Sequence, residues 1–296
     1  MDGLPLVSLT QQIINGLSIG SIYALIAVGY SLVFGVLGLI NFAHGDAYMF
    51  STFAVLAMIL AGVPFPLAVL AGLVLAGVLA MMIERVAYRP LRGAHRMAPT
   101  VSAVGVALIL QNLTQLIWGP ETRAFPNPLP QGVFIVEGVA IPELALAVVA
   151  IAAAAGLLVA LITQYTGWGR SMRAIRDDLA TAQLMGIEVN RIISVVYALG
   201  GALGVLGGVL FAAYYNTVYL GMGFTGTLYA FTAAVIGGIG SLRGAFVGGI
   251  ALGLLQALAV TFISSGYTAT VTFVALIILL IVRPYGLFGT PTIRRA

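Results

Sequence analysis

Long stretches without acidic or basic side chains constrain this chain more than any other feature. Residues 47–83, 97–120 and 144–169 contain no Asp, Glu, Lys, Arg or His. A membrane-spanning helix needs about 20 mainly apolar residues, so each stretch has room for one or two spans. Over the whole chain, 61% of residues are hydrophobic and 7% are charged, whereas soluble domains average roughly 25% charged residues. The sequence therefore predicts an all-α integral membrane protein.

We expect about 8–10 transmembrane helices, with broken or re-entrant segments, in a single domain that covers residues 1–296. The apolar segments behind this expectation are 12–36, 47–62, 66–84, 98–118, 142–163, 192–214, 226–241, 245–264 and 267–282. The second and seventh are short enough to turn back within the membrane. No basic residue precedes the first, so we expect a retained span and not a cleaved signal peptide. The proline-rich residues 119–142 are expected to form an irregular external loop, either a plain connector or a face for an extracytoplasmic partner.

The arginines predict how the chain is oriented. All 13 basic residues are arginine, and only Arg123 falls on one side of the predicted spans. Twelve fall on the other side: Arg85, Arg89, Arg92, Arg96, Arg170, Arg173, Arg176, Arg191, Arg243, Arg283, Arg294 and Arg295. Basic residues concentrate in cytoplasmic loops. We therefore predict a multi-pass membrane protein with its N-terminus outside and its C-terminus in the cytoplasm.

Several residue types are missing, and their absence excludes whole classes of enzyme. Without lysine the chain cannot form a P-loop or a Schiff base, and without cysteine it has no thiol nucleophile. Its two histidines, His44 and His95, are too few for a metal cluster, and Ser241 has no GxSxG context. The arginines are spread over several loops, which does not indicate nucleic-acid binding. We predict a protein that is not an enzyme and that holds no metal and no cofactor.

A polar segment separates the first two apolar runs. Residues 41–46 read Asn-Phe-Ala-His-Gly-Asp. Polar groups near a span usually face protein or water, and irregular backbone at that depth is tolerated only inside protein or along a cavity. Asn41, Phe42, His44, Gly45 and Asp46 are therefore candidates for the substrate pathway. The alternative is a capped cytoplasmic turn, with Asn41 as N-cap, Asp46 in the first turn and His44 in solvent.

Glycines recur at a spacing of four in the second half of the chain. The candidates for close helix packing are Gly200, Gly204, Gly208, Gly237, Gly240, Gly244 and Gly248. This spacing places glycines on one helix face and lets neighbouring backbones approach closely, either around a moving pathway or as ordinary membrane packing. Residues 237–244 are too rich in glycine for a regular helix, which predicts a break there.

One polar segment, residues 166–191, is predicted to lie in the cytoplasm. Residues 171–185 favour an amphipathic helix that ends at Gly186, with Ile175, Leu179, Ala182 and Met185 on one face. Such a helix can dock into the groove of a partner protein, or it can rest on its own subunit or on lipid. The candidates for coupling to an ATPase are Arg173, Asp177, Asp178, Ala182 and Gly186.

Five stretches resemble the permease subunits of branched-chain amino acid ABC importers. They are GLSIGSIYAL at 16–25, GYSLVFG at 29–35, NFAHGD at 41–46, IERVAYRPLR at 83–92 and FTAAVIGGIGS at 231–241. Together they extend over nearly the whole chain.

The resemblance implies a location in the bacterial inner membrane and several partners. They are a second, similar permease subunit, two cytoplasmic ATP-binding subunits and a periplasmic substrate-binding protein, with ATP held by the partners and not by this chain. Ala180, Ala182 and Gly186 are similar to the coupling motif of such permeases, although Asp178 and Thr181 depart from its commonest form. Members of the family import leucine, isoleucine and valine, and others import urea, short amides or small carboxylates.

The combined prediction is the permease subunit of an ATP-driven importer for branched-chain or other small amino-acid-like solutes. The alternative is an ion-coupled secondary transporter. Proton-coupled carriers usually place ionisable groups within their spans, and the middles of these spans are uncharged. Sodium held by backbone carbonyls would leave no such signature, so this alternative stays open.

Overall fold

The computed structural model describes residues 4–95, 97–127, 129, 131–136, 138–283 and 285–289, and the chain in it is mostly helical. The longer helices are α1 (Leu4–Leu37), α2 (Ala43–Leu60), α3 (Phe65–Ile83), α4 (Met97–Trp118), α5 (Glu143–Tyr165), α8 (Val189–Tyr215), α9 (Met222–Gly237), α10 (Leu242–Phe262) and α11 (Thr268–Val282). The shorter elements are η1 (Glu84–Tyr88), η2 (Arg89–Leu91), α6 (Gly167–Asp177), α7 (Leu179–Leu184) and η3 (Ser265–Tyr267). The predicted all-α membrane fold is confirmed.

Within the described residues, eight helices are long and apolar enough to cross a membrane. The seventh predicted segment, 226–241, corresponds to α9, which has 16 residues and is too short to count among them. Its short length was expected, but it ends at Gly237, before the predicted boundary. Hydroxyl groups inside the spans donate to carbonyls four residues earlier, as Ser21 does to Leu17 at 2.7 Å and Thr52 to Tyr48 at 2.8 Å. These bonds let polar residues remain in apolar helices.

Burial divides the helices into a centre and a perimeter. In the most hydrophobic window of α1, 78% of the residues are buried, against 6% for the last span, which ends in α11. Side chains of α1, α2 and α8 make up most of the core, and Tyr30, Phe53 and Tyr197 are among its largest members. The exposed faces of α3, α4, α5 and α11 carry Leu, Val and Ile. An apolar outer surface of this kind is suited to lipid.

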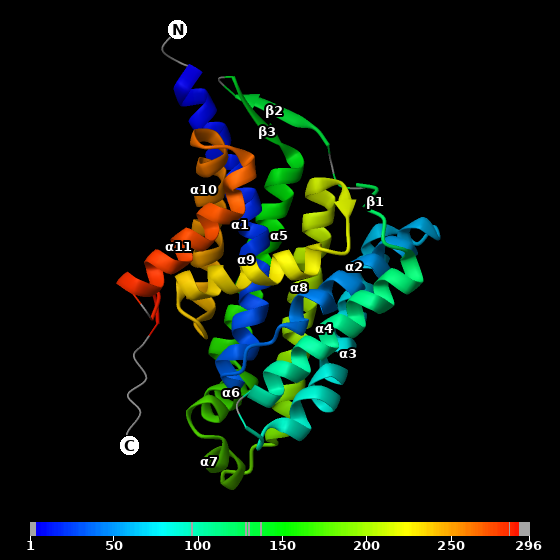
Figure 1. Cartoon of the computed structure of the whole chain (residues 1–296), viewed down its shortest axis with the longest axis vertical. Helices are drawn as coiled ribbons and strands as arrows, with labels where there is room; N and C mark the ends of the chain where they lie inside the picture. The colour runs from blue at the N-terminus through cyan, green and yellow to red at the C-terminus, as the bar shows by residue number, and fades with distance from the viewer. Residues whose placement is uncertain are drawn as a thin grey trace.

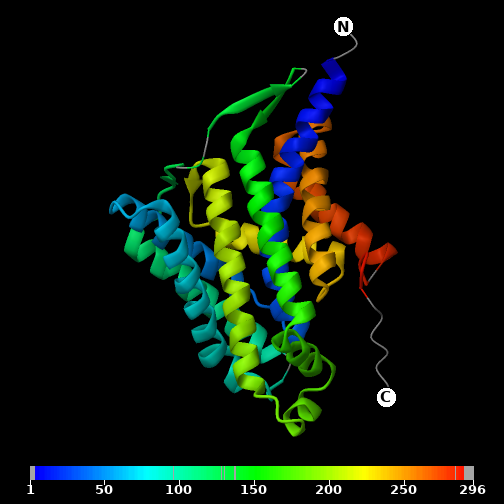
Figure 2. The same ribbon diagram turned by 180° about the vertical axis from the view of Figure 1, so that it is seen from behind.

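The loops gather at two opposite ends of the helices. Figure 1 shows α6 and α7 at the lower end, near the point where α3 meets α4. The start of α1, strand β1 and the β2–β3 hairpin lie at the upper end, and the view from behind shows the same division (Figure 2). In Figure 1 α9 runs across the middle of the molecule, at a steep angle to α1, α5 and α8.

The segment predicted as an irregular external loop contains strands. β2 (Val133–Val136) pairs antiparallel with β3 (Val139–Pro142), and β1 (Arg123–Ala124) pairs with β4 (Thr217–Val218) just after α8. The apolar run at 133–136 matches the β-propensity of Val, Phe and Ile, and Gly138 at φ 84° makes the tight turn. The expectation of irregular structure was therefore wrong for this part of the loop.

A glycine turn joins α9 to α10. Gly238 and Gly240 have φ angles of 103° and 83°, which non-glycine residues rarely adopt. The Ser241 hydroxyl then accepts a 3.1 Å hydrogen bond from Gly244 N–H and begins α10. The predicted break is confirmed. Gly240 consequently lies in the turn, so it does not share a helix face with Gly244 and Gly248 as the spacing had indicated.

Candidate translocation site

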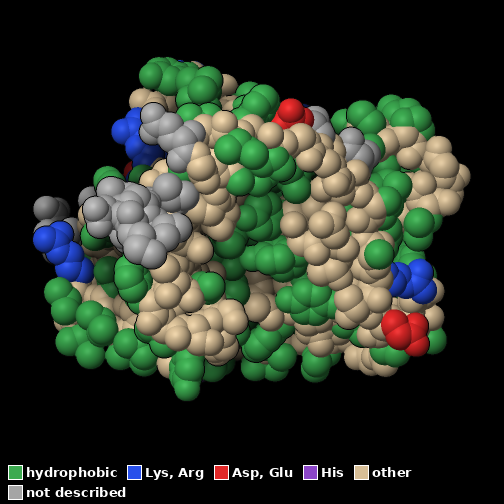
Figure 3. Space-filling view, turned by 90° about the horizontal axis from the view of Figure 1, so that it is seen from above, with side chains coloured by type: hydrophobic (Ala, Val, Ile, Leu, Met, Phe, Trp, Pro, Cys, Tyr) green, Lys and Arg blue, Asp and Glu red, His purple; other side chains and the backbone are tan. Residues whose placement is uncertain are grey.

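A cavity of about 690 Å³ lies toward the upper ends of α1, α8 and α10. Six tyrosines contribute to its wall, and we call it the tyrosine chamber: Tyr23, Tyr48, Tyr214, Tyr215, Tyr219 and Tyr229. Among the described residues that line it, none is Asp, Glu, Lys, Arg or His. Seen from above, charged side chains lie toward the margin of the molecule, around a centre of hydrophobic and uncharged groups (Figure 3).

Hydrogen bonds fix several side chains of the chamber wall. Tyr23 donates to Gln256 Oε1 at 2.9 Å, and Gln256 Nε2 donates to the Thr272 hydroxyl at 2.7 Å. The Tyr48 hydroxyl donates to Met222 O at 2.6 Å and so ties α2 to the start of α9. A wall of aromatic faces with a few oriented, uncharged polar groups can hold a small solute that has an apolar part and no net charge.

The predicted pathway segment 41–46 lies at the start of α2, next to the chamber. His44 is one helical turn before Tyr48 on the same face of α2, and both side chains lie against Gly204 of α8. His44 is only 4% exposed, so the alternative of a solvated histidine in a capped turn is wrong. Its Nε2 has no hydrogen-bond partner among the described residues.

The other members of the segment have separate contacts. Asn41 Oδ1 accepts bonds from the Tyr88 hydroxyl at 2.9 Å and from Ala43 N–H at 3.1 Å, the second of which resembles a cap. At Gly45, an added methyl carbon would lie 2.0 Å from the Gly223 carbonyl oxygen, so α2 and α9 cross in backbone contact there. Asp46 is 1% exposed and accepts a 2.9 Å bond from Gln111 Nε2.

Three more unpaired groups are buried in α1 and α8. The hydroxyls of Tyr30 and Ser31 in α1 and of Tyr197 in α8 make no hydrogen bond with a described residue, and the Tyr30 ring lies edge-on to His44 at 6.1 Å. Native structures rarely leave buried polar groups unsatisfied, and each instance needs an explanation such as water or a changing conformation. With His44 Nε2, these groups form a polar but unbonded layer in the core, built from α1, α2 and α8.

A second hollow, of about 510 Å³, opens on the side of the molecule between α4 and α9. We call it the lateral hollow. Phe42 and Asp46 contribute to its lining, as do Gln111, Asn112 and Gln115 of α4. The predicted pathway residues are therefore divided: His44 lies near the chamber, whereas Phe42 and Asp46 border the lateral hollow. Sequence reasoning missed the chamber tyrosines, which come from α1, α2, α8 and α9 and from the link between α8 and α9, and share no motif.

The predicted coupling helix is in fact two helices. Asp178 adopts extended backbone angles and ends α6, and its carboxylate accepts a 2.7 Å bond from Thr181 N–H at the start of α7. That hydrogen bond lowers the pKa of the Asp178 carboxyl. A continuous helix over 171–185 was wrong because an aspartate that can cap competes with helix continuation. Gly186 does follow α7, at φ 80°.

The apolar face predicted for this segment is also divided. Ile175 and Ala182 are buried, at 3% and 2% exposed, whereas Leu179 is 39% and Met185 is 78% exposed. Arg173 donates to the carbonyl of Thr163 at the end of α5, and Asp177 pairs with Arg176 at 3.5 Å on the surface. Ala182 therefore packs within this subunit, and Leu184 and Met185 are the most exposed apolar side chains of the segment, at 88% and 78%.

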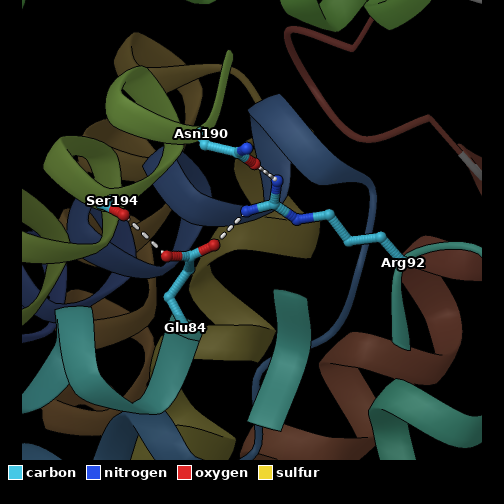
Figure 4. Close-up of polar contacts among 4 residues, drawn as sticks. All are labelled: Glu84, Arg92, Asn190 and Ser194. Carbon is cyan, nitrogen blue, oxygen red and sulfur yellow. Dashed lines mark hydrogen bonds and ion pairs between the residues drawn. The ribbon is translucent and has the colours of Figure 1, made fainter. Parts of the chain in front are cut away.

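A buried carboxylate joins α3 to α8 just above this segment. Glu84 is fully buried, accepts a 2.7 Å bond from the Ser194 hydroxyl and pairs with Arg92. Arg92 also donates to Asn190 Oδ1 at 2.8 Å (Figure 4). Sequence reasoning missed this buried cluster. A carboxylate directly after a long apolar run, with an arginine eight positions later, was the available signal.

The glycines predicted for packing make close helix contacts. Methyl carbons built on Gly200 and Gly208 would lie 2.9 Å from the Gly29 carbonyl oxygen of α1 and 2.5 Å from the Thr52 hydroxyl of α2. Gly244 faces Gly237, and Gly248 faces Ala233, across the α9–α10 pair. α8 and α10 thus approach their neighbours at backbone distance, as small residues in membrane helices allow.

The chain is similar in sequence to known proteins over nearly its whole length. Residues 12–282 match the family described as branched-chain amino acid transport system / permease component. The high-affinity branched-chain amino acid transport system permease protein BraD of Pseudomonas aeruginosa is 38% identical, over 96% of this chain and 97% of its own. LivH of Escherichia coli K12, which carries the same description, is 37% identical over the same shares. PsaBC from Streptococcus pneumoniae, solved in complex with a Fab, is a more distant match, with a TM-score of 0.48 and 15% identity over 92% of this chain and 91% of that chain. The chain therefore belongs to the family of branched-chain amino acid transport system permease components.

Proposed function

We propose that this permease subunit carries branched-chain or similar small amino-acid-like solutes through an importer, and that the solute enters the tyrosine chamber. The observation that carries the proposal is the chamber itself, with about 690 Å³ of space and a lining of aromatic and uncharged polar groups. An aliphatic side chain would lie against Phe211, Met222 and the tyrosine rings. Gln256 and Asn15 offer neutral hydrogen-bonding groups to a zwitterion, which needs no fixed counter-charge to be solvated.

The chamber is closed on its inner side by the crossing of α2 and α9. The Tyr48–Met222 hydrogen bond and the backbone contact of Gly45 with Gly223 hold this crossing. His44 Nε2, Ser31 Oγ and Tyr197 Oη lie unbonded in the adjacent core. We assign this layer the role of a gate, in which water or the solute satisfies these groups when the helices separate.

The energy comes from outside the chain in this proposal. The sequence contains no lysine and hence no P-loop, so two cytoplasmic ATP-binding subunits supply the work. The exposed Leu184 and Met185, at the end of α7 just before Gly186, form the contact. The lower end of the molecule in Figure 1 is then cytoplasmic, because the arginine-bearing links lie there. A periplasmic binding protein delivers solute at the upper end, beside the β2–β3 hairpin.

The polar lining of the lateral hollow is the observation that favours a contact with a second permease subunit there. Asn112 and Gln115 are exposed in the outer half of a 22-residue span, and Asp46 lies behind them. Polar side chains at membrane depth usually face protein or a water-filled cavity and not lipid tails. We therefore place the partner permease against α4 and α9. Cysteine pairs that include Asn112→Cys should cross-link to the partner, and failure of cross-linking there but not elsewhere would contradict this placement.

Uptake by the reconstituted importer tests the chamber. Tyr229→Ala removes an aromatic wall, and we expect the KM for leucine to rise about tenfold, since an aromatic contact is worth roughly 1.4 kcal/mol. Tyr267→Ala is the matched control, because Tyr267 is 57% exposed and lies outside the lining. Its effect should stay within about twofold. Equal effects of the two variants would refute the chamber as the solute site.

Uptake that survives ATP depletion but not collapse of an ion gradient would instead indicate a secondary carrier.

A further inference from the structure

A basic groove of about 670 Å³ lies at the lower end, between η1–η2 and the link from α7 to α8. Arg85 and Arg89 form one wall, and Arg191 at the start of α8 stands on the other. Glu188 is the single acidic residue among the described residues that line it. None of these groups belongs to the tyrosine chamber, and the groove has no place in the transport path described above.

The charges of this groove are not balanced within the described chain. Arg92, its neighbour in sequence, is neutralised by Glu84. Arg191 approaches Glu188 at 3.6 Å in an exposed pair, but neither Arg85 nor Arg89 forms an ion pair with a described residue. Three guanidinium groups against one carboxylate leave two positive charges unmatched. Such a cluster favours an anion, and guanidinium groups bind phosphate through paired N–H donors.

The position of the groove indicates where the anion comes from. α3 has 19 residues, or about 28 Å at 1.5 Å per residue, which matches the roughly 30 Å hydrocarbon core of a bilayer. Its outer face is an exposed apolar stripe, formed by Leu70, Val74, Val78 and Met82. Arg85 and Arg89 continue this stripe beyond the end of α3 and therefore lie at the level of the lipid headgroups.

A tryptophan beside Arg191 also indicates that the groove lies at the level of the lipid headgroups. The Arg191 guanidinium lies 5.8 Å from the centre of the Trp168 ring, and tryptophan is enriched where a membrane meets water. We propose that the groove binds the phosphate of an anionic phospholipid, whose acyl chains lie along the stripe of α3. Gln183 and Gly186 border the same groove, so the bound headgroup also supports the segment that follows α7.

Lipid binding to the purified full-length protein tests this site. Phosphatidylglycerol is added to the protein in a neutral detergent, with phosphatidylcholine as the uncharged comparison and inorganic phosphate as the free anion. Native mass spectrometry counts bound lipid, and thermal unfolding reports its effect. We expect phosphatidylglycerol to bind and stabilise the wild-type protein more than either of the other two.

Paired substitutions decide whether the groove is responsible. The double variant Arg85→Gln with Arg89→Gln should bind phosphatidylglycerol roughly 30-fold more weakly, from the usual contribution of two basic residues near an anionic surface. Arg170→Gln with Arg176→Gln removes the same charge from α6 at the same end and should leave binding unchanged.

Three results would overturn the proposal. Equal losses in both double variants would mean a diffuse positive surface. Stabilisation by inorganic phosphate to the same degree as by phosphatidylglycerol would mean a soluble-anion site. Unchanged lipid binding with loss of the co-purifying ATPase in the Arg85/Arg89 variant would mean that an acidic protein segment is the occupant.

Discussion

The Ser194 hydroxyl of α8 donates a 2.7 Å hydrogen bond to the carboxylate of Glu84, which lies 110 positions earlier at the end of α3. The other carboxylate oxygen of Glu84 pairs with Arg92. Glu84 therefore connects three parts of the lower end: the extension of α3, the link into α4 and the first turns of α8. The segment that we assign to ATPase contact leads directly into α8. The buried Glu84 cluster therefore holds in place the helix end to which this segment is attached.

Removal of the Glu84 carboxylate should destabilise the fold. In Glu84→Ala, the Arg92 side chain, 16% exposed, keeps its charge and loses its partner, and breaking a buried pair in this way costs about 3–5 kcal/mol. The free energy of unfolding in lipid nanodiscs would show the loss. Arg176→Ala is the control, because its pair with Asp177 is exposed and should contribute less than about 1 kcal/mol. Equal stability of both variants would mean that the Glu84 cluster is not a structural anchor.

Substitution of His44 should slow transport without loss of the folded protein. A buried group that must form a hydrogen bond in the open state contributes about 1–3 kcal/mol, which corresponds to roughly 5- to 150-fold in uptake rate for His44→Ala. His95→Ala serves as the control, because His95 is exposed. Protein level and ATPase co-purification should match the wild type in both variants. Normal uptake kinetics in both His44→Ala and Asn41→Ala would contradict the proposal that the unbonded groups beside His44 form a gate.

Exposed and buried positions near α7 should respond differently to an introduced charge. Leu184→Asp places a carboxylate on a side chain that is 88% exposed, so the protein should fold normally and lose the ATPase in pull-down experiments. Ala182→Asp buries the charge within the subunit and should lower the unfolding temperature as well. If Leu184→Asp and Met185→Asp both retain the ATPase and normal uptake, the contact lies elsewhere at the lower end.

The stability of α7 should depend on pH, because protonation of the Asp178 carboxylate weakens its cap. The hydrogen bond from Thr181 N–H lowers the pKa of Asp178 in the folded state, so its contribution is present above the pKa of an unfolded aspartate and is lost as pH falls through the lower folded value. The protection factors of the amides of residues 179–184, corrected for the intrinsic pH dependence of exchange, should therefore fall at acid pH. Asp178→Asn retains a capping side chain and should lose most of this pH dependence, whereas Asp178→Ala should show low protection at every pH. A pH profile of Asp178→Asn identical to that of the wild type would contradict the assignment.

Single cysteines should report the orientation of the chain. The sequence has no native cysteine, so Ala94→Cys at the lower end and Gln131→Cys at the upper end can each be labelled alone. Both positions are exposed. In intact cells an impermeant thiol reagent should label Gln131→Cys and not Ala94→Cys. The opposite pattern would reverse the orientation that the arginines predict.

The spans were predictable because each depends on its own residues. An apolar run of about 20 residues has to form a helix in lipid, where its backbone groups find no water, and α4 (Met97–Trp118) and α5 (Glu143–Tyr165) begin and end within two residues of the predicted segments. The break at Gly238 was predictable for the same local reason, since glycine alone tolerates its φ angle. Asp178 shows the limit of prediction from local sequence. There, a continuous helix and a helix break capped by the aspartate differ little in energy.

The sequence by itself determined that the chain spans a membrane several times and where most of its spans lie, and it predicted which loops share one side of the membrane. These properties follow from hydrophobicity and from arginine placement, and none of them requires a long-range contact. Only the tertiary structure decided that Tyr23, Tyr48 and Tyr229 line one chamber, and that Ala182 is buried while Leu184 is exposed. Helices α2, α8 and α9 converge beside this chamber because Gly45 and Gly204 permit close approach, and pairings between distant helices depend on the shapes of both partners.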